Sequence, residues 1–138
     1  MLEKILELFY SQEVFKEYPR PQVTAYFKSI IDNGQIVTVE KEGKIIAFQD
    51  YWIINRRIRD LMLRMTREQA IIFGIWGCYP HCPGGKHLHI NFTVVHKDYR
   101  DKFLTVELAR KIYQKNPDAK TVIYYRLNNK AYLSEVRK

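Results

Sequence analysis

Apolar side chains recur at helical spacing through the first quarter of the chain. Over residues 2–9 they stand three or four positions apart, which predicts a helix with 13–18 as its extension. The segment Pro19-Arg20-Pro21 then ends that helix. The same spacing over 22–31 predicts a second helix, which ends at Asp32-Asn33-Gly34 because Asn and Gly tolerate a positive φ.

The next segments have the residue types of strands. Gln35 to Glu40 is rich in β-branched residues, Lys41-Glu42-Gly43 is a short polar turn, and Lys44 to Ile54 is a longer apolar run. Two such runs around a short turn predict a β-hairpin.

Residues 55–86 have a mixed pattern and are predicted to form an insertion. Arg56 to Met65 fits a basic helix or an extended excursion, and both interpretations stay open. Thr66-Arg67-Glu68-Gln69 fits a capping box, so a short helix is expected before Gly74. Gly77 to Gly85 holds three Gly and two Pro in nine residues, which indicates a loop.

His87 to Val95 is the clearest strand of the chain. Strict alternation divides its side chains between an apolar face with Leu88, Ile90, Phe92 and Val94 and a less buried face with His87, His89, Asn91, Thr93 and Val95.

The last third of the chain completes the order of elements. A helix is predicted from about Asp101 to Gln114, a strand over Thr121 to Leu127 and a short terminal helix over Asn129 to Val136. A strand-helix-strand unit requires a right-handed crossover and gives a locally parallel pair. The predicted fold class is α/β (α+β), with a mixed central sheet flanked by helices in a single domain over 1–138.

Composition narrows the class of protein. A chain of 138 residues with 46% apolar residues has room for one compact core. No apolar run reaches the length of a membrane span, so we expect a cytoplasmic protein with no membrane partner. Lys and Arg exceed Asp and Glu by 23 to 15, which favours anionic partners such as nucleic acid, a phosphorylated cofactor or an acidic protein.

One stretch carries a resemblance to a known family. Val94 and Val95 end a strand, and after a polar bend the segment Tyr99 to Leu104 leads into the predicted helix. This stretch is similar to the diphosphate-binding turn of the GNAT family of acyl-CoA-dependent N-acetyltransferases, where a Tyr-Arg turn precedes Arg-Gly-Lys-Gly-Ile-Gly. The order of elements over roughly 35–133 matches as well, and Asn128-Asn129-Lys130-Ala131 resembles the Asn-x-x-Ala element that opens the family's next helix.

The resemblance implies acetyl-CoA as the cofactor and a GNAT-like fold. A helix N-terminus offers free backbone N–H groups and a partial positive charge, which suits a diphosphate. The resemblance places the pantetheine arm on the backbone of Val94 and Val95 and the diphosphate near Arg100, Lys102, Phe103 and Thr105.

Three residues depart from the family pattern in this turn. Asp101, Phe103 and Thr105 stand where the family has glycines, which let phosphate oxygens approach the backbone. Phe103 is the largest departure, because its benzyl group is expected to shield the amides or to fill space that the cofactor needs.

His89 is the catalytic residue that the resemblance implies. Its strand would lie beside the acceptor amine, and a neutral imidazole can remove the proton of that amine. The alternative interpretation is an ordinary polar side chain on the less buried face of the strand. The family's thiolate-protonating tyrosine comes later in the chain, and Tyr132 is displaced from that position by a few residues.

The predicted function is therefore acyl-CoA-dependent N-acetylation of an amine-bearing acceptor, or a GNAT-like protein that has lost catalysis. After Ala131 the family's final strand is missing, and the sheet edge there would be covered by the N-terminal helices or by a partner chain, as in a homodimer.

The alternative function is a non-enzymatic basic module that binds nucleic acid or an acidic protein. Tyr51 and Trp52 can stack on bases beside a run of cations. That run contains Arg56, Arg57, Arg59, Arg64 and Arg67. The plain interpretation is that the arginines are solvated and that the two aromatic rings pack inside the hairpin.

A zinc site is a weaker alternative to the prediction of no metal. Its candidate ligands are Cys78, Cys82, His87 and His89, because Cys-x3-Cys followed by His-x-His offers four donors. The plain interpretation is a loop with two small thiols followed by two strand histidines.

Overall fold

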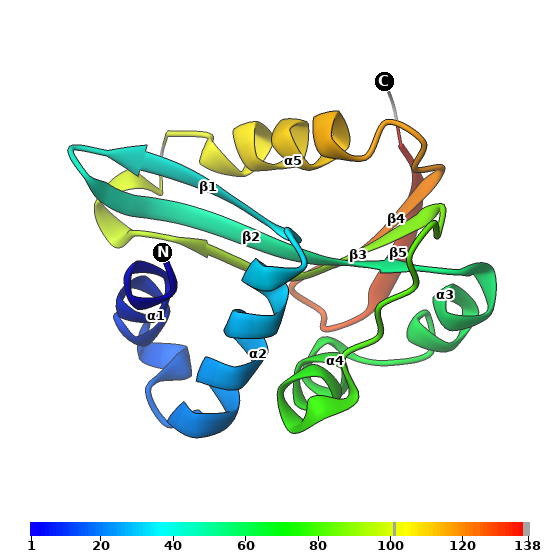
Figure 1. The fold of residues 1–138 in the computed structure, drawn as a ribbon, viewed down its shortest axis with the longest axis horizontal. Coiled ribbons are helices and arrows are strands. Elements are labelled where there is room, and N and C mark those ends of the chain that lie inside the picture. Colours follow the sequence, from blue (N-terminus) through cyan, green and yellow to red (C-terminus); the bar gives the residue numbers. More distant parts are fainter. Residues whose placement is uncertain (101, 137–138) are drawn as a thin grey trace.

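The computed structural model describes residues 1–100 and 102–136, apart from the side chain of Cys78. The chain forms a five-stranded sheet in the order β1-β2-β3-β4-β5, with helices on both faces (Figure 1). α5 (Leu104–Lys115) covers one face, and α1 (Leu2–Tyr10), α2 (Arg20–Asp32) and α4 (Arg67–Phe73) lie on the other. The predicted fold class, a mixed sheet flanked by helices, is confirmed.

The strands follow the predicted hairpin and crossover. They are β1 (Ile36–Lys41), β2 (Lys44–Ile54), β3 (His87–Val95), β4 (Thr121–Tyr125) and β5 (Ala131–Glu135). β3 and β4 are parallel because α5 carries the chain back across the sheet, and the other neighbouring pairs are antiparallel.

The helices of the first half form where the sequence predicts them. The extension after α1 is a single 3-10 turn, η1 (Glu13–Phe15), and not a continuation of the helix. The basic segment forms a helix, α3 (Arg56–Met62), and is not extended. The capping box of α4 is confirmed, because the Thr66 hydroxyl accepts the Gln69 N–H and the Gln69 side chain accepts the Thr66 N–H. A π-type turn, η2 (Gly74–Cys78), leads into the predicted loop.

The predicted terminal helix over 129–136 is wrong, since these residues enter β5. A turn closed by the Asn129 N–H on the Arg126 carbonyl, with Asn129 at φ 67°, reverses the chain against β4. Tyr132 then lies opposite Tyr124 and stacks on it with ring centroids 6.0 Å apart. Cross-strand pairing of this kind stabilises a strand and is not visible in the spacing of one segment.

The core has two parts, one on each face of the sheet. Beneath α1 and α2, the rings of Phe9, Phe27, Phe48 and Phe92 meet largely edge to face, a favoured geometry for buried aromatic side chains. Beneath α5, Leu108 and Ile112 lie in a smaller cluster.

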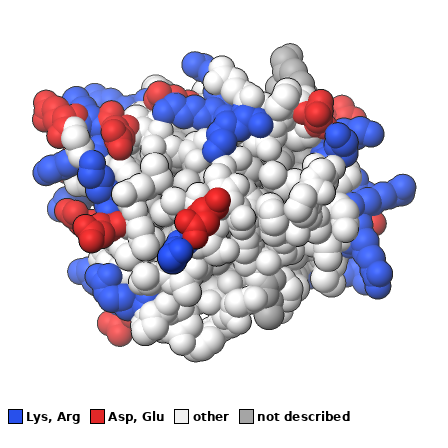
Figure 2. Space-filling model, in the orientation of Figure 1, with Lys and Arg blue, Asp and Glu red and all other residues white. Residues whose placement is uncertain are grey.

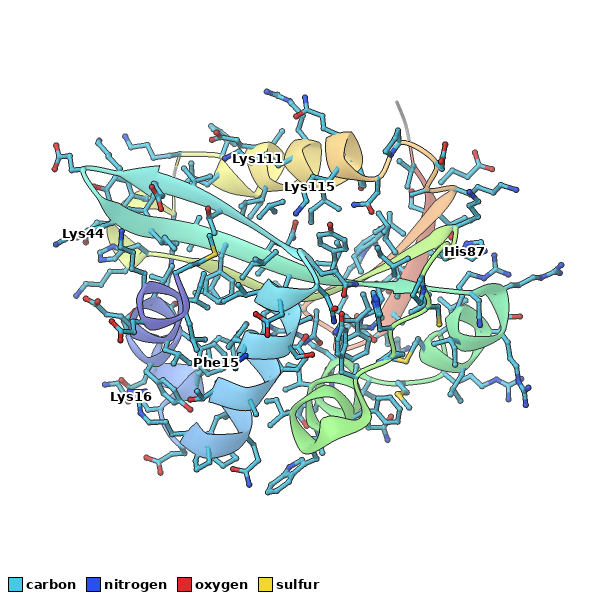
Figure 3. The ribbon with its side chains drawn as sticks, viewed as in Figure 1. Phe15, Lys16, Lys44, His87, Lys111 and Lys115 are labelled. Carbon is cyan, nitrogen blue, oxygen red and sulfur yellow. The ribbon has the colours of Figure 1, made fainter. Side chains whose placement is uncertain are left out.

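Two lysines tie α5 to β1. Figure 3 shows Lys111 and Lys115 on α5, above the β1–β2 hairpin. Lys111 Nζ donates to the carbonyl of Thr38 at 2.6 Å, and Lys115 Nζ donates to the carbonyls of Gly34 and Ile36. These bonds help to fix α5 over the sheet. Within the two described stretches of chain, no helix has the length and hydropathy of a membrane-crossing segment.

Candidate active site

A cleft of about 1200 Å³ opens where β3 and β4 separate. The ladder between them joins only His87–His89 to Thr121–Ile123. Beyond that point the cleft is lined by side chains from both faces of the sheet, Thr105, Ala109 and Tyr113 on the side of α5 and Val14, Phe15, Tyr18 and Ile71 on the other. A ligand in this cleft would therefore contact elements that cover both faces of the sheet.

A β-bulge in β3 accompanies this separation. Gln49 pairs with Thr93 and Tyr51 pairs with Ile90, so two residues of β3 lie opposite Asp50. The extra residue reverses the alternation of side chains. Leu88 packs beneath α5, whereas Phe92 and Val94 pack beneath α1 and α2. The single apolar face predicted for this strand is wrong, because alternation assigns faces only in a strand without a bulge.

A buried polar network holds the bulge in place. Asp50 Oδ1 accepts the backbone N–H of Phe92 at 3.0 Å, and Asp50 Oδ2 accepts the hydroxyl of Tyr26. Trp52 Nε1 and Asn91 Nδ2 each donate to the Tyr26 oxygen at 2.8 Å. The side chains of all four network residues are buried, and burial raises the pKa of Asp50 to about 7.

His89 is buried beside this network, so the alternative that placed it on a less buried face is wrong. Its ring stacks on Trp52 with centroids 4.4 Å apart, and its Nε2 lies 2.8 Å from the Tyr125 hydroxyl. Burial lowers the pKa of His89 to about 3, so the imidazole is neutral near pH 7.

Tyr125 carries the hydroxyl that connects His89 to the cleft. The Nδ1 of His89 has no hydrogen-bond partner in the described part of the chain. An unpaired acceptor is less costly than an unpaired N–H, which favours the tautomer whose Nε2–H donates to Tyr125. The Tyr125 proton is then free to point into the cleft that Tyr125 lines, and burial raises the pKa of Tyr125, which keeps its hydroxyl protonated.

The residues predicted for acyl-CoA lie along β3 and the turn into α5. Val94 is buried and Val95 half-buried on the strand that borders the cleft. Arg100 donates to Gln12 Oε1 at 2.7 Å and to the Val95 carbonyl at 3.5 Å. Lys102 is exposed, and Thr105 lines the cleft on the first turn of α5. Asp101 lies outside the described residues.

Phe103 occupies the position before α5, which begins at Leu104 and not near residue 101 as predicted. It has φ 56° and ψ 32°, the left-handed conformation that glycine adopts easily, and its side chain is 81% exposed. The ring therefore packs against little of the protein. Within the described residues no side chain caps the start of α5. The Val106 N–H donates to the Phe103 carbonyl, and the N–H groups of Leu104 and Thr105 have no partner there and are available to a ligand.

Because L-residues are strained in the left-handed region, Phe103→Gly is expected to be more stable than Phe103→Ala. The expected difference in the free energy of unfolding is about 1 kcal/mol, since both variants remove the ring and only glycine removes the strain. Urea denaturation of the two variants measures the difference. Equal stabilities would show that residue 103 leaves the left-handed region when its ring is removed.

The residues predicted for nucleic-acid binding do not form one surface. Tyr51 and Trp52 are 1% and 0% exposed, so they pack in the core and cannot stack on bases. Arg59 pairs with Asp60 at 3.0 Å and Arg67 lines the cleft. The remaining arginines of the run, Arg56, Arg57 and Arg64, are exposed. Figure 2 shows Lys and Arg side chains at the rim of the molecule, where acidic side chains lie among them.

The candidate zinc ligands are engaged elsewhere where they can be described. His87 Nδ1 lies 2.7 Å from the Thr121 hydroxyl, and His89 bonds to Tyr125. Cys82 is a free thiol, and the side chain of Cys78 lies outside the described residues. In the part of the chain that the structure describes, no three His, Cys, Asp or Glu side chains come together as metal ligands.

Three residues of the site were missed by reasoning from the sequence: Asn91 and Tyr125, which line the cleft, and Asp50, which lies in the buried network beside it. Asp50 had a signal, since it interrupts a largely apolar strand and a buried polar residue needs a partner, whereas Asn91 stands among other polar residues of its strand and had none. Tyr125 had none, because only the packing of β4 beside β3 brings its hydroxyl to His89.

Comparison with known proteins gives matches among solved structures alone. No family model matches the sequence, and no curated protein sequence is similar to it. The GphF GNAT-like decarboxylase in complex with isobutyryl-CoA has a TM-score of 0.62 at 16% identity, over 88% of this chain and 59% of that one. The loading GNATL domain of CurA from Lyngbya majuscula has a TM-score of 0.63 at 13% identity, over 88% and 58% of the two chains.

The chain has a GNAT-like fold. A protein of Staphylococcus aureus Mu50 assigned as an acetyltransferase supports the same conclusion, with a TM-score of 0.60 and 14% identity over 99% of this chain and 93% of that one. This GNAT-like chain spans about three fifths of the decarboxylase and loading-domain chains. The identities are low, so the likeness is one of fold.

Proposed function

We propose that this GNAT-like protein binds an acyl-CoA in the β3–β4 cleft and transfers its acyl group to an amine. The observation that carries the proposal is the cleft itself, which opens to both faces of the sheet where β3 leaves β4. One face can then admit the acyl donor and the other the acceptor. The structural neighbour in complex with isobutyryl-CoA supports the choice of donor.

The residues at the α5 side of the cleft fit an acyl-CoA. Past His89 the edge of β3 that faces β4 has no strand partner in the described residues, so its backbone groups can bind the amides of a pantetheine arm. The uncapped first turn of α5 suits a diphosphate, and Arg100 and Lys102 precede it. Of the predicted residues Thr105 lines the cleft, while Val94, Val95, Arg100 and Lys102 lie outside its lining, on β3 and the turn into α5, and we assign all five the binding roles predicted for them.

The chemistry requires one proton to move between the two reacting molecules. Acyl-CoA supplies an activated acyl group, and attack by the amine nitrogen forms a C–N bond, breaks the C–S bond and leaves a surplus proton on nitrogen. Tyr125 can donate its proton to sulfur and regain one from nitrogen, so no net proton is lost. His89 then acts through Tyr125 as a positioning residue, because it is buried and its pKa of about 3 makes it a weak base.

Calorimetric titration with acetyl-CoA and isobutyryl-CoA tests the proposal. We expect saturable binding in the micromolar range, weakened about three-fold to ten-fold by Lys102→Ala, which removes an exposed cation beside the uncapped helix start. Lys4→Ala, on α1, removes the same charge away from the cleft and serves as the matched control. The absence of saturable heat at millimolar ligand would overturn the proposal.

Two reactions are then assayed with the bound donor. Acyl transfer to amines is the proposed reaction. Decarboxylation of a carboxyacyl-CoA is the second candidate, because one structural neighbour is named as a GNAT-like decarboxylase. Release of free thiol that depends on added amine supports transfer, whereas release of carbon dioxide without amine supports decarboxylation.

A further inference from the structure

One residue of the cleft wall has a buried amide oxygen that has no hydrogen-bond partner in the described residues. Asn91 lines the cleft, is only 4% exposed, and its Oδ1 makes no hydrogen bond to any described residue. A buried acceptor without a partner is uncommon in folded proteins and is destabilising. Such an oxygen is therefore a candidate for contact with a ligand that carries an N–H or O–H donor.

The buried network fixes which end of the Asn91 amide faces away from it. Trp52 Nε1 can only donate, so the Tyr26 oxygen must accept from it. With Asp50 ionised, the single proton of Tyr26 goes to Asp50 Oδ2. The Asn91 atom that contacts the Tyr26 oxygen must then be a donor, which is Nδ2 at 2.8 Å. The carbonyl oxygen is left to accept from another group.

A second group without a partner lines the cleft at the first residue of α4. Arg67 lines the cleft and is half-buried, and its guanidinium makes no ion pair or hydrogen bond within residues 1–100 and 102–136. Its charge lowers the pKa of Tyr18 against the larger effect of burial, so it lies near that hydroxyl. The neighbouring Glu68 is exposed and forms no ion pair with it in the same residues.

These groups differ in the chemistry that they favour. An amide oxygen accepts hydrogen bonds and suits an amine, whereas a guanidinium offers paired N–H donors and suits a carboxylate. Phe15 and Ile71 contribute apolar side chains to the lining of the same cleft. A molecule with an amine at one end and a carboxylate at the other would satisfy both groups.

We propose that the acceptor is an amino carboxylate, whose amine donates to Asn91 Oδ1 and whose carboxylate pairs with Arg67. This inference rests on the proposed acyl transfer, since it names the molecule that receives the acyl group. Asn91 places the nitrogen in the cleft that Tyr125 also lines. The donor then enters from the side of α5 and the acceptor from the side of α4.

Binding of matched compounds to the full chain tests the inference without any turnover. The probes are leucine, 4-aminobutanoate and 6-aminohexanoate, which differ in the separation of the two groups. Each is compared with the amine that lacks its carboxylate, namely 3-methylbutylamine, propylamine and pentylamine. 4-Aminobutanoate is also compared with butanoate, which lacks the amine. Calorimetry at pH 8 keeps Asp50 ionised, because its pKa is about 7.

We expect at least one amino carboxylate to bind about ten-fold or more tightly than its matched amine, and 4-aminobutanoate to bind more tightly than butanoate. Arg67→Met keeps the apolar stem and is expected to remove the preference over the amine, while leaving the affinity for the amine itself unchanged. Arg64→Met is the matched control, since Arg64 is exposed and does not line the cleft. Asn91→Ala is expected to lower the affinities for the amino carboxylate and for the amine by the same factor.

The inference is overturned if all three amino carboxylates bind no better than their amines, or if Arg67→Met lowers both affinities equally. The comparison of Arg67→Met with Arg64→Met tests the inference even if Asn91→Ala fails to fold. Titration of the same samples with acetyl-CoA separates the two proposals. Acetyl-CoA binding without a preference for amino carboxylates removes the acceptor assignment alone. The reverse result removes acyl transfer, and with it the acceptor role, and leaves a binding site for amino carboxylates.

Discussion

Relative to the wild-type protein, Asp50→Asn is expected to make the free energy of unfolding rise with pH between about pH 4 and 6.5. The expected slope is about 1.4 kcal/mol for each pH unit. The asparagine variant retains His89, whose pKa burial lowers from 6.5 to about 3 in the folded protein. In this interval the unfolded chain binds a proton at His89 and the folded protein does not, so acid favours unfolding.

His89→Gln is expected to give the opposite slope over the same interval. This variant retains Asp50, whose pKa burial raises from 3.8 to about 7. A group whose pKa is higher in the folded than in the unfolded state makes its full contribution to stability below the pKa of the unfolded state. It loses that contribution as the pH rises toward the pKa of the folded state. In the wild-type protein the two effects cancel over this interval, because the folded protein binds one proton at Asp50 and the unfolded chain binds one proton at His89.

Urea denaturation of the wild type and both variants at half-unit steps from pH 4 to 8 measures these slopes. Subtracting the wild-type curve removes the contribution of the exposed groups that all three proteins share. Variants with the same pH dependence as the wild type would contradict the assignment of Asp50 as a buried acid and His89 as a buried neutral base. The comparison uses slopes, so a loss of overall stability in either variant does not obscure it.

Tyr125→Phe is expected to lower kcat for acyl transfer about 100-fold or more, with the dissociation constant for acyl-CoA changed by less than about three-fold. The change removes the hydroxyl that lines the cleft and leaves the His89 Nε2 without its partner. Some loss of stability, of about 1–3 kcal/mol, follows from the unpaired buried nitrogen. Steady-state kinetics and calorimetry on the same samples separate the effect on the reaction from that on binding.

Tyr132→Phe is the matched control for this variant. Tyr132 lies on β5, which β4 separates from His89 on β3, and its hydroxyl accepts a hydrogen bond from Asn128. Loss of this hydroxyl is expected to leave kcat nearly unchanged. His89 is tested by rescue, because glutamine can still donate an N–H to Tyr125 and leucine cannot. A Tyr125→Phe protein with wild-type kcat, or equal activity of the two His89 variants, contradicts the assigned roles.

Much of the fold could be predicted from local patterns of residues. The spacing over 2–9 and 22–31, the hairpin of β1 and β2 and the capping box at Thr66 each depend on neighbours within a few positions. The terminal segment shows the limit of such patterns. Ala131–Glu135 has no strong local preference, and it forms a strand because β4 offers an open edge for pairing.

The candidate site was less accessible to sequence reasoning. The turn between β3 and α5 has a local motif, so Val94, Val95, Arg100, Lys102 and Thr105 could be proposed as ligands of acyl-CoA. His89 could be named as a functional residue, but its burial and its dependence on Tyr125 could not, because the bulge at Asn91 reverses the faces of the strand. A one-residue irregularity of this kind leaves no trace in an alternating pattern.

The sequence by itself determined the class of fold, the order of the elements and the segment that resembles a GNAT diphosphate turn, because periodicity and capping act over short distances. Only the tertiary structure decided that Asp50, Tyr26, Trp52 and Asn91 form one buried network beside an open cleft. These residues come from α2, β2 and β3, and their hydrogen bonds exist only when the three elements pack together. The chemistry of the cleft follows from that packing, since burial sets the pKa of Asp50 and of His89.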